Sequence, residues 1–272
     1  MSIDDMRLTL DWAGAEGWNP GLGDAAPFLA ADPEGMLMGV VDGEPAVSIA
    51  AVRYGATYGF IGLYICRADY RGHGYGAALA RAGLARLEGR VIGLDGVVAR
   101  IDNYARLGFA PAHRSYRFGG IVDDCGPRDR RVIEIDTTAE GAVIAFDRNF
   151  FPAEREAFLR AWLMPEPTRH GLAFVEDGTL TGYGVVRQCG EGAKIGPLFA
   201  LGAEGADVLF RALATAFDGP IFLDIPEPNP DGLELAERYS LSTQFEAVRM
   251  YRGPEPLLPL ANVFGITSFE LG

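Results

Sequence analysis

The chain has 272 residues, of which 49% are hydrophobic and 22% charged, a composition typical of a globular protein with one large domain or two smaller ones. Its formal net charge of −13 argues against a nucleic-acid partner, because affinity for phosphate backbones needs clustered lysine and arginine. The acidic field favours a cationic small substrate such as an amine, although excess acid can also serve only to keep a protein soluble.

The sequence carries neither a targeting signal nor a metal-binding pattern. It has no run of about 18 apolar residues, and its acidic N-terminal segment lacks an apolar signal core. The three cysteines lie far apart, which is typical of a reducing compartment, and the three histidines are too scattered for a metal site of the usual spacing. We therefore expect a cytoplasmic protein without membrane attachment and without a bound metal.

The first predicted elements are strands. Residues 35–55 predict a β-hairpin, because two apolar runs flank the turn-forming residues 42–45. An apolar run over 57–66 predicts a third strand. After a charged turn, residues 74–89 predict a helix, because apolar residues recur there with helical spacing.

Three further elements and a linker complete the first half. Residues 90–95 form a short apolar run typical of a buried strand, and 98–109 predict a short helix with a glycine at its end. Residues 111–120 alternate as a strand does. The polar, turn-forming stretch 121–131 is interpreted as a linker.

The second half repeats landmarks of the first. Four landmarks recur after 129 to 135 residues, and a second hairpin candidate turns at Asp177-Gly178. Similar spacing across separate landmarks predicts two copies of one fold unit, at residues 1–120 and 132–272, although chance similarity is the alternative. The paired landmarks are Ile61–Cys66 with Ile195–Ala200, Leu94 with Leu223, Tyr104 with Tyr239, and His113–Arg117 with Val248–Arg252.

Three alternating glycines, Gly72, Gly74 and Gly76, stand at the start of the predicted 74–89 helix. The favoured interpretation is a pyrophosphate cradle, in which backbone N–H groups and the helix dipole face one anion and Arg71 adds a full charge. An alternative is a dinucleotide-binding fingerprint, in which Asp95 would accept a hydrogen bond from the ribose of the ligand. In this sequence, however, a charged turn separates the first glycine of the fingerprint from the preceding strand. A plain turn without a ligand is the other alternative.

The stretch ICRADYRGHGYGAAL resembles the acetyl-CoA loop of the GNAT acetyltransferase superfamily. The signature of that superfamily, Arg/Gln-x-x-Gly-x-Gly/Ala after an apolar strand, corresponds here to Arg71-x-x-Gly74-x-Gly76. Downstream, Tyr104–Phe109 (YARLGF) is similar to the superfamily's Tyr-x-x-x-Gly-Phe element. One departure is Val97, where many members carry an asparagine that contacts the cofactor.

The resemblance implies an α+β fold with two tandem GNAT-like units, each a twisted, mixed, mostly antiparallel sheet flanked by helices. The second unit is degenerate, because LGAEGADVLF stands where the first has YRGHGYGAAL. The implied reaction is direct transfer of acetyl from the cosubstrate acetyl-CoA to the amine of a small-molecule or amino-acid-like acceptor. A non-catalytic acetyl-CoA-binding regulatory module and a nucleotide-dependent oxidoreductase are the alternatives.

The resemblance also implies roles for individual residues. Backbone N–H groups between Tyr64 and Cys66 would polarise the thioester carbonyl. Tyr104 would protonate the leaving thiolate or, alternatively, pack at the sheet edge. Candidates for the base are Glu16 and Asp95, each of which can instead be a surface or hydrogen-bonded carboxylate, and a base acting through water is also open. The expected cofactor contacts are Tyr64, Cys66, Arg71, Gly72, His73, Gly74, Tyr75 and Gly76.

The acceptor side is expected from two segments. Trp12, Trp18 and Phe28 lie where the GNAT fold forms its acceptor wall, and they can instead belong to the core. Residues 132–272 end in the apolar and aromatic stretch ANVFGITSFELG, which suits docking better than exposure to solvent. We therefore expect the second half to pack against the first and to shape the amine site. No motif indicates the acceptor's identity or the oligomeric state.

Overall fold

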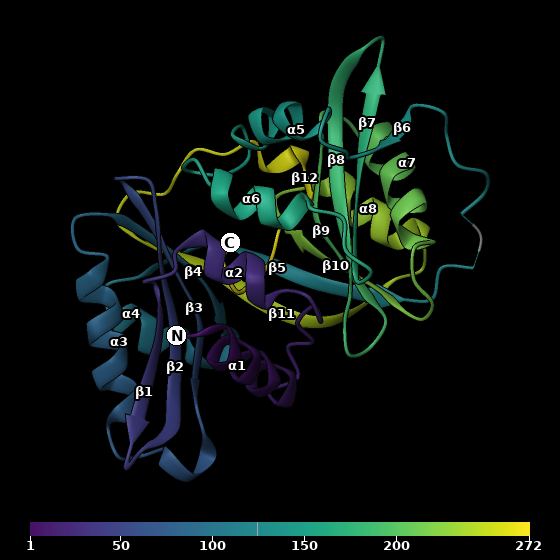
Figure 1. Cartoon of the computed structure of the whole chain (residues 1–272). Helices are drawn as coiled ribbons and strands as arrows, with labels where there is room; N and C mark the ends of the chain where they lie inside the picture. The colour runs from purple at the N-terminus through teal and green to yellow at the C-terminus, as the bar shows by residue number, and fades with distance from the viewer. Residues whose placement is uncertain (124) are drawn as a thin grey trace.

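The computed structural model describes residues 1–123 and 125–272 and shows two α/β units side by side (Figure 1). The first unit comprises α1 (Ile3–Ala15), α2 (Ala25–Ala31), β1 (Met36–Val41), β2 (Glu44–Tyr54), β3 (Tyr58–Cys66), α3 (Tyr75–Arg86), β4 (Val91–Val97), α4 (Ile101–Arg106) and β5 (Ala110–Gly120). The second comprises β6 (Val132–Glu134), α5 (Glu140–Asp147), α6 (Glu156–Leu163), β7 (Arg169–Glu176), β8 (Thr179–Gln188), β9 (Ala193–Ala200), α7 (Ala203–Ala214), β10 (Ile221–Pro226), α8 (Pro230–Arg238), β11 (Ser242–Arg252) and β12 (Val263–Gly265).

Both predicted hairpins are confirmed, as β1–β2 and β7–β8, and the predicted strands and helices of the first half are present. The predicted helix over 98–109 is shorter than expected: a 3-10 turn at Val98–Arg100 leads into α4, which ends at Arg106. Helix α1 was not predicted. The signal for the start of α1 is nevertheless local in the sequence. Ser2 and Asp5 form a capping box in which each side chain accepts a hydrogen bond from the other's backbone N–H.

The two units exchange their last long strands within one sheet. The strand order β1-β2-β3-β4-β11-β5-β10-β9-β8-β7-β6 places β11 of the second unit between β4 and β5 of the first. β5 in turn pairs with β10 of the second unit. Most pairs are antiparallel, and β3–β4 and β9–β10 are parallel. Neither unit therefore completes its own sheet with its own strands.

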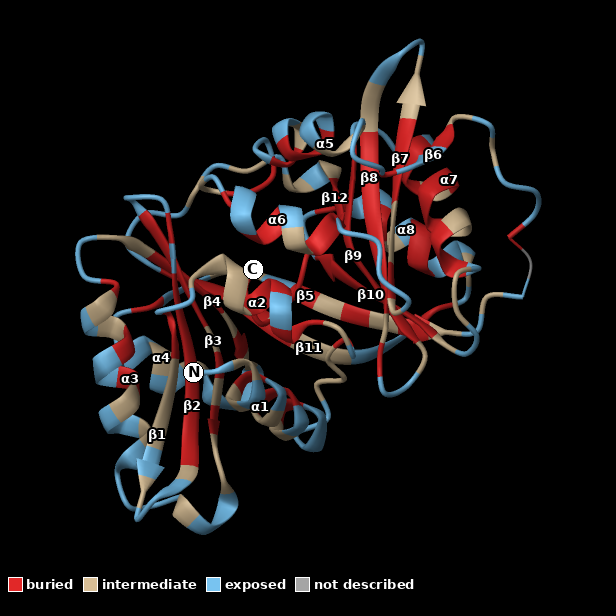
Figure 2. Cartoon of the chain, viewed as in Figure 1, coloured by how far each residue is buried: buried red, intermediate tan, exposed pale blue. Residues whose placement is uncertain are grey.

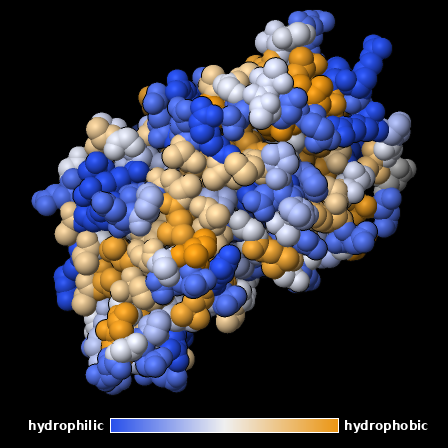
Figure 3. All heavy atoms as spheres, viewed as in Figure 1, coloured by the Kyte–Doolittle hydropathy of each residue, from blue (hydrophilic) through white to orange (hydrophobic). Residues whose placement is uncertain are grey.

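Buried residues follow the strands through both units, as the red segments in Figure 2 show. Helices α2 and α6 pack together between the units, with Phe28 stacked on Trp162 at 6.0 Å between ring centroids. Phe28 is thus a core residue. On the face shown in Figure 3, hydrophobic side chains lie in several areas separated by hydrophilic ones. Within the described residues, no helix is long and apolar enough to span a membrane.

Candidate active site

A cavity opens where β3 and β4 separate. These parallel strands pair only as far as Ile61 and Leu94, so among the described residues the backbone of β3 beyond Ile61 has no paired strand on that side. A cavity of about 610 Å³ occupies the gap. Leu63 has a positive φ of 47°, and the pairing of β2 with β3 shifts register beside it. Backbone groups of this irregular stretch therefore face the cavity instead of a partner strand.

The glycine loop forms one end of the cavity. Gly72 and Gly74 have φ angles of 82° and 83°, in the left-handed region that glycine adopts without strain. Gly74 caps α3 without any side-chain hydrogen bond, so the first N–H groups of α3 remain open to an anion. A Cβ atom at Gly76 would lie 2.7 Å from the Tyr64 hydroxyl oxygen, so only glycine permits that close approach.

Arg71 is held at the mouth of the cavity. Its guanidinium donates hydrogen bonds to the Cys66 carbonyl at 2.8 Å and to the Glu16 carboxylate at 2.5 Å. Both side chains of the ion pair remain partly exposed, with exposures of 51% for Arg71 and 39% for Glu16. The loop is therefore tied to the end of α1. His73 and Tyr75 stack on each other at 5.8 Å between ring centroids and do not line the cavity.

Tyr104 faces the cavity from α4. Its ring packs on Gly96 of β4, where a Cβ atom would come within 2.8 Å. Burial raises the pKa of the Tyr104 phenol, the neighbouring Tyr64 adds to the rise, and Arg100 opposes it. Burial also raises the pKa of Tyr64. The Tyr104 phenol is thus protonated at neutral pH and can donate a proton.

Family comparisons apply to both halves of the chain. A model described as the acetyltransferase (GNAT) family matches residues 4–119, and one described as the acetyltransferase (GNAT) domain matches residues 143–265. Holothin acyltransferase of Pseudoalteromonas sp. (strain SANK 73390) is 31% identical over 273 residues, covering 100% of this chain and 92% of that protein. The chain belongs to the GNAT acetyltransferase family. The predicted tandem arrangement is confirmed.

Solved structures show the same fold. An acetyltransferase-like protein from Pyrococcus horikoshii, described as putative, superposes with a TM-score of 0.85 at 22% identity, covering 100% of this chain and 94% of that one. A tandem GNAT protein from the clavulanic acid biosynthesis pathway superposes with a TM-score of 0.61 at 16% identity, covering 93% and 94% of the two chains. These similarities support the two-unit GNAT architecture.

The cavity between β3 and β4 brings together most of the residues expected from the sequence. Tyr104, Glu16 and Asp95 line it, as do six of the eight expected cofactor contacts: Tyr64, Cys66, Arg71, Gly72, Gly74 and Gly76. Cys66 faces it as a thiol whose pKa is raised by burial, which is typical of an unreactive cysteine. The individual roles assigned from the sequence stay predictions.

Asp95 is fully engaged within this cavity. Its two carboxylate oxygens accept hydrogen bonds from the Arg249 guanidinium, both at 2.8 Å, and Arg249 also lies over the Phe60 ring. Burial raises the pKa of Asp95 even though Arg249 opposes the rise. Because Arg249 belongs to β11, this ion pair fastens the exchanged strand to β4.

Sequence reasoning missed the wall opposite the glycine loop. Arg117 of β5, Phe245 of β11 and Phe269 line the cavity, with the Arg117 guanidinium 5.8 Å and 5.1 Å from the two ring centroids. Arg117 forms a buried, two-bond ion pair with Asp224 and donates to the Trp18 carbonyl at 2.8 Å. Trp18, expected near the acceptor, lines the cavity as well. The repeated HRSYR/VRMYR landmark had marked Arg117 only as part of a strand.

The corresponding gap in the second GNAT unit is filled by the chain itself. Strands β9 and β10 pair in parallel only up to Ile195 and Leu223. Beyond that point β12 pairs with β9, and a Cβ atom at Gly196 would lie 2.5 Å from the Thr267 carbonyl oxygen. In the second unit, β12 and the Thr267 backbone thus lie where the first unit has its gap.

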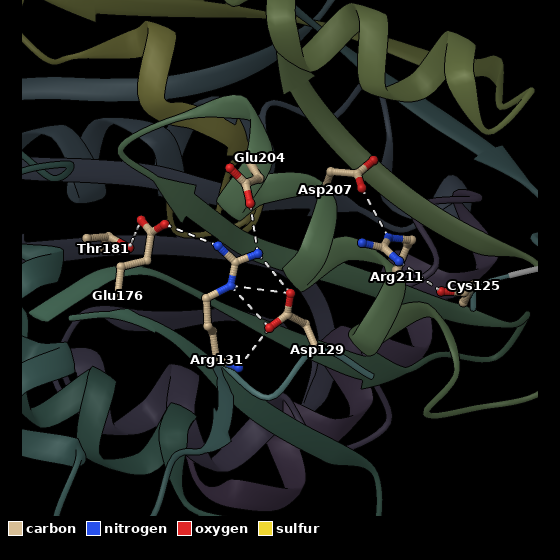
Figure 4. Close-up of polar contacts among 8 residues, drawn as sticks. All are labelled: Cys125, Asp129, Arg131, Glu176, Thr181, Glu204, Asp207 and Arg211. Carbon is tan, nitrogen blue, oxygen red and sulfur yellow. Dashed lines mark hydrogen bonds and ion pairs between the residues drawn. The ribbon is translucent and has the colours of Figure 1, made fainter. Parts of the chain in front are cut away.

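The start of α7 differs from the start of α3 in charge. Glu204 lies in the first turn of α7 and accepts a hydrogen bond from Arg131 at 2.8 Å, while Arg131 also contacts Asp129 and Glu176 (Figure 4). A carboxylate already occupies the positive end of this helix, so a phosphate would meet a like charge. The start of α7 is therefore less suited to an anion than the start of α3.

Proposed function

We propose that this chain is an N-acetyltransferase that transfers acetyl from acetyl-CoA to the amine of a small molecule. The observation that carries the proposal is the junction of an uncapped α3 N-terminus with the gap between β3 and β4. The open N–H groups suit a pyrophosphate, and the gap admits a flexible acyl carrier to the buried phenol of Tyr104. These residues fit acetyl-CoA. A plain turn without a ligand would explain neither the open N–H groups of α3 nor the gap beside them.

Acetyl-CoA supplies an activated acyl group and a thiolate leaving group. The residues of this chain then have separable tasks. Gly72, Gly74 and the first N–H groups of α3 hold the pyrophosphate, and the backbone between Tyr64 and Cys66 stabilises developing charge on the acyl oxygen. Tyr104, whose phenol is protonated at neutral pH, donates a proton to the departing sulfur.

The acceptor enters from the wall that the second unit completes. Phe245, Phe269 and Trp18 offer aromatic faces, and the net charge of −13 favours a cationic amine over an anion. The relative of 31% identity is named for an acyl transfer to holothin, so holothin is the first acceptor to test. We propose a small, planar amine as the substrate class. The expected cytoplasmic location stays a prediction.

Calorimetry and a thiol-release assay test the proposal. We expect one acetyl-CoA per chain, and thiol release that depends on an added amine from a panel containing holothin and other aromatic amines. Gly74→Glu adds a carboxylate where φ is 83°, so it should abolish cofactor binding while the protein stays folded. Tight binding of acetyl-CoA without turnover of any amine would favour the regulatory module instead.

A further inference from the structure

A third acidic residue, Glu270, lines the cavity, and unlike Glu16 and Asp95 it forms no hydrogen bond or ion pair through its carboxylate with any described residue. Glu270 is only 3% exposed, and its Oε2 atom is fully enclosed without a hydrogen bond. Among the described residues, no hydrogen bond or ion pair to the Glu270 carboxylate is present. A buried carboxylate normally has such partners, because an uncompensated one costs several kcal/mol. Glu270 is thus a cavity-lining residue whose carboxylate has hydrogen-bonding capacity that no described residue uses.

The backbone of Glu270 is held firmly against the irregular part of β3. The Glu270 carbonyl oxygen lies so close to Gly62 that a Cβ atom there would be 1.8 Å from it. The terminal segment (263–272) is held next to this contact by hydrogen bonds of Leu271. The Tyr54 hydroxyl donates to the Leu271 carbonyl at 3.1 Å, and the Ser268 hydroxyl accepts from the Leu271 N–H at 3.1 Å. Glu270 thus sits beside the backbone that faces the acyl group in the proposed reaction.

Charged groups on four strands interact electrostatically with Glu270. They are balanced by partners of their own, except Lys194, whose ammonium donates only to the Trp18 carbonyl at 3.2 Å among the described residues. Burial, helped by Arg117, lowers the pKa of Lys194. These groups are Asp95 on β4, paired with Arg249; Arg117 on β5, paired with Asp224; Arg187 on β8, paired with Asp24; and Lys194 on β9.

We propose that Glu270 is the general base that accepts a proton from the attacking amine, an assignment that rests on the proposed acetyl transfer. As the amine nitrogen forms its bond to the acyl carbon, the carbon–sulfur bond breaks. The nitrogen gives a proton to Glu270, and the sulfur takes the proton of Tyr104, which leaves an amide and a free thiol. Glu270 then returns its proton to solvent and Tyr104 is reprotonated. The second GNAT unit thereby contributes a catalytic residue to the first.

The test compares Glu270→Gln with Glu255→Gln, a matched change at an exposed residue of the same region. The assay uses acetyl-CoA with the panel amine that wild type turns over fastest. For Glu270→Gln we expect kcat to fall ~10²- to 10⁴-fold, acetyl-CoA affinity to stay unchanged, and the acid limb of the kcat/KM profile to disappear. Glu270→Asp keeps the carboxylate but withdraws it by one methylene, so it should retain the acid limb and lower kcat.

Two outcomes would overturn this assignment alone. A rise in KM with kcat and the acid limb intact would make Glu270 an anchor for the acceptor, and wild-type kcat in either Glu270 variant would remove it from the reaction. The aspartate variant keeps the test decisive if the glutamine variant does not fold. Failure of wild type to turn over any amine would instead overturn the proposed function, and this assignment with it.

Discussion

Gly62→Ala tests whether the contact between β3 and the terminal segment governs turnover. The new Cβ would lie 1.8 Å from the Glu270 carbonyl oxygen and 2.7 Å from its carbonyl carbon, whereas real Cβ atoms essentially never come closer than 3.0 Å to such atoms. The segment must therefore move by at least the difference between 3.0 and 1.8 Å, which exceeds 1 Å. A misplacement of about 1 Å at a reacting group can cost about 10²-fold in rate.

We therefore expect Gly62→Ala to lower kcat about 10²-fold and to destabilise the fold by about 1–3 kcal/mol, the usual cost of overpacking. Acetyl-CoA affinity should change little, because the glycine loop is untouched. Steady-state kinetics, calorimetry and thermal unfolding measure the three quantities. Gly141→Ala is the control, since a Cβ atom there meets nothing within 4 Å. Wild-type turnover in Gly62→Ala, with an unchanged Tm, would refute the reasoning.

Three further predictions concern the acid, the fold's pH dependence and the exchanged strands. Tyr104→Phe should lower kcat by ~10²- to 10⁴-fold with an unchanged acetyl-CoA Kd, and unchanged turnover would make Tyr104 a packing residue. Burial lowers the pKa of His113 from 6.5 to about 4, so the unfolded state binds more protons between these values and stability falls as pH falls through them. Urea titrations should show wild type losing about 3 kcal/mol more than His113→Gln between pH 6.5 and pH 4, at about 1.4 kcal/mol per pKa unit, and equal losses would contradict this. A fragment ending at Pro127 lacks both strand neighbours of β5, so size-exclusion chromatography should show aggregation; a soluble monomer with full amine turnover would be incompatible with the exchanged sheet.

The glycine loop could be predicted because its signals are local. Gly72 and Gly74 stand where the chain needs a positive φ, and an uncapped helix follows directly. The same holds for the hairpin turns at Asp42-Gly43 and Asp177-Gly178, where each pair adopts positive φ. Tyr104 was found through the resemblance of YARLGF to the GNAT Tyr-x-x-x-Gly-Phe element. For these residues, a few neighbours in the chain carry the whole signal.

The acceptor wall has no such local signature. Glu270 was overlooked, although it is a single acidic residue within an apolar, aromatic segment that was predicted to dock. Docking buries its charge, and a buried charge is costly unless a partner or a function accounts for it. Arg249, the partner of Asp95, lies about 150 residues further along the chain, and nothing around either residue indicates the pairing. The sequence therefore left Asp95 open as a candidate base or as a surface or hydrogen-bonded carboxylate.

The sequence by itself determined the repeated unit, the hairpins, the glycine loop and the position of Tyr104, since each depends on residue spacing and backbone preferences within a short stretch. Only the tertiary structure decided which strands pair. Every strand edge offers the same N–H and C=O groups, so β5 can pair equally well with β4 or with β10, and the choice depends on side chains such as Arg249 and Arg117 that meet their partners only after folding. The same long-range packing brings Glu270 to the cavity of the first unit.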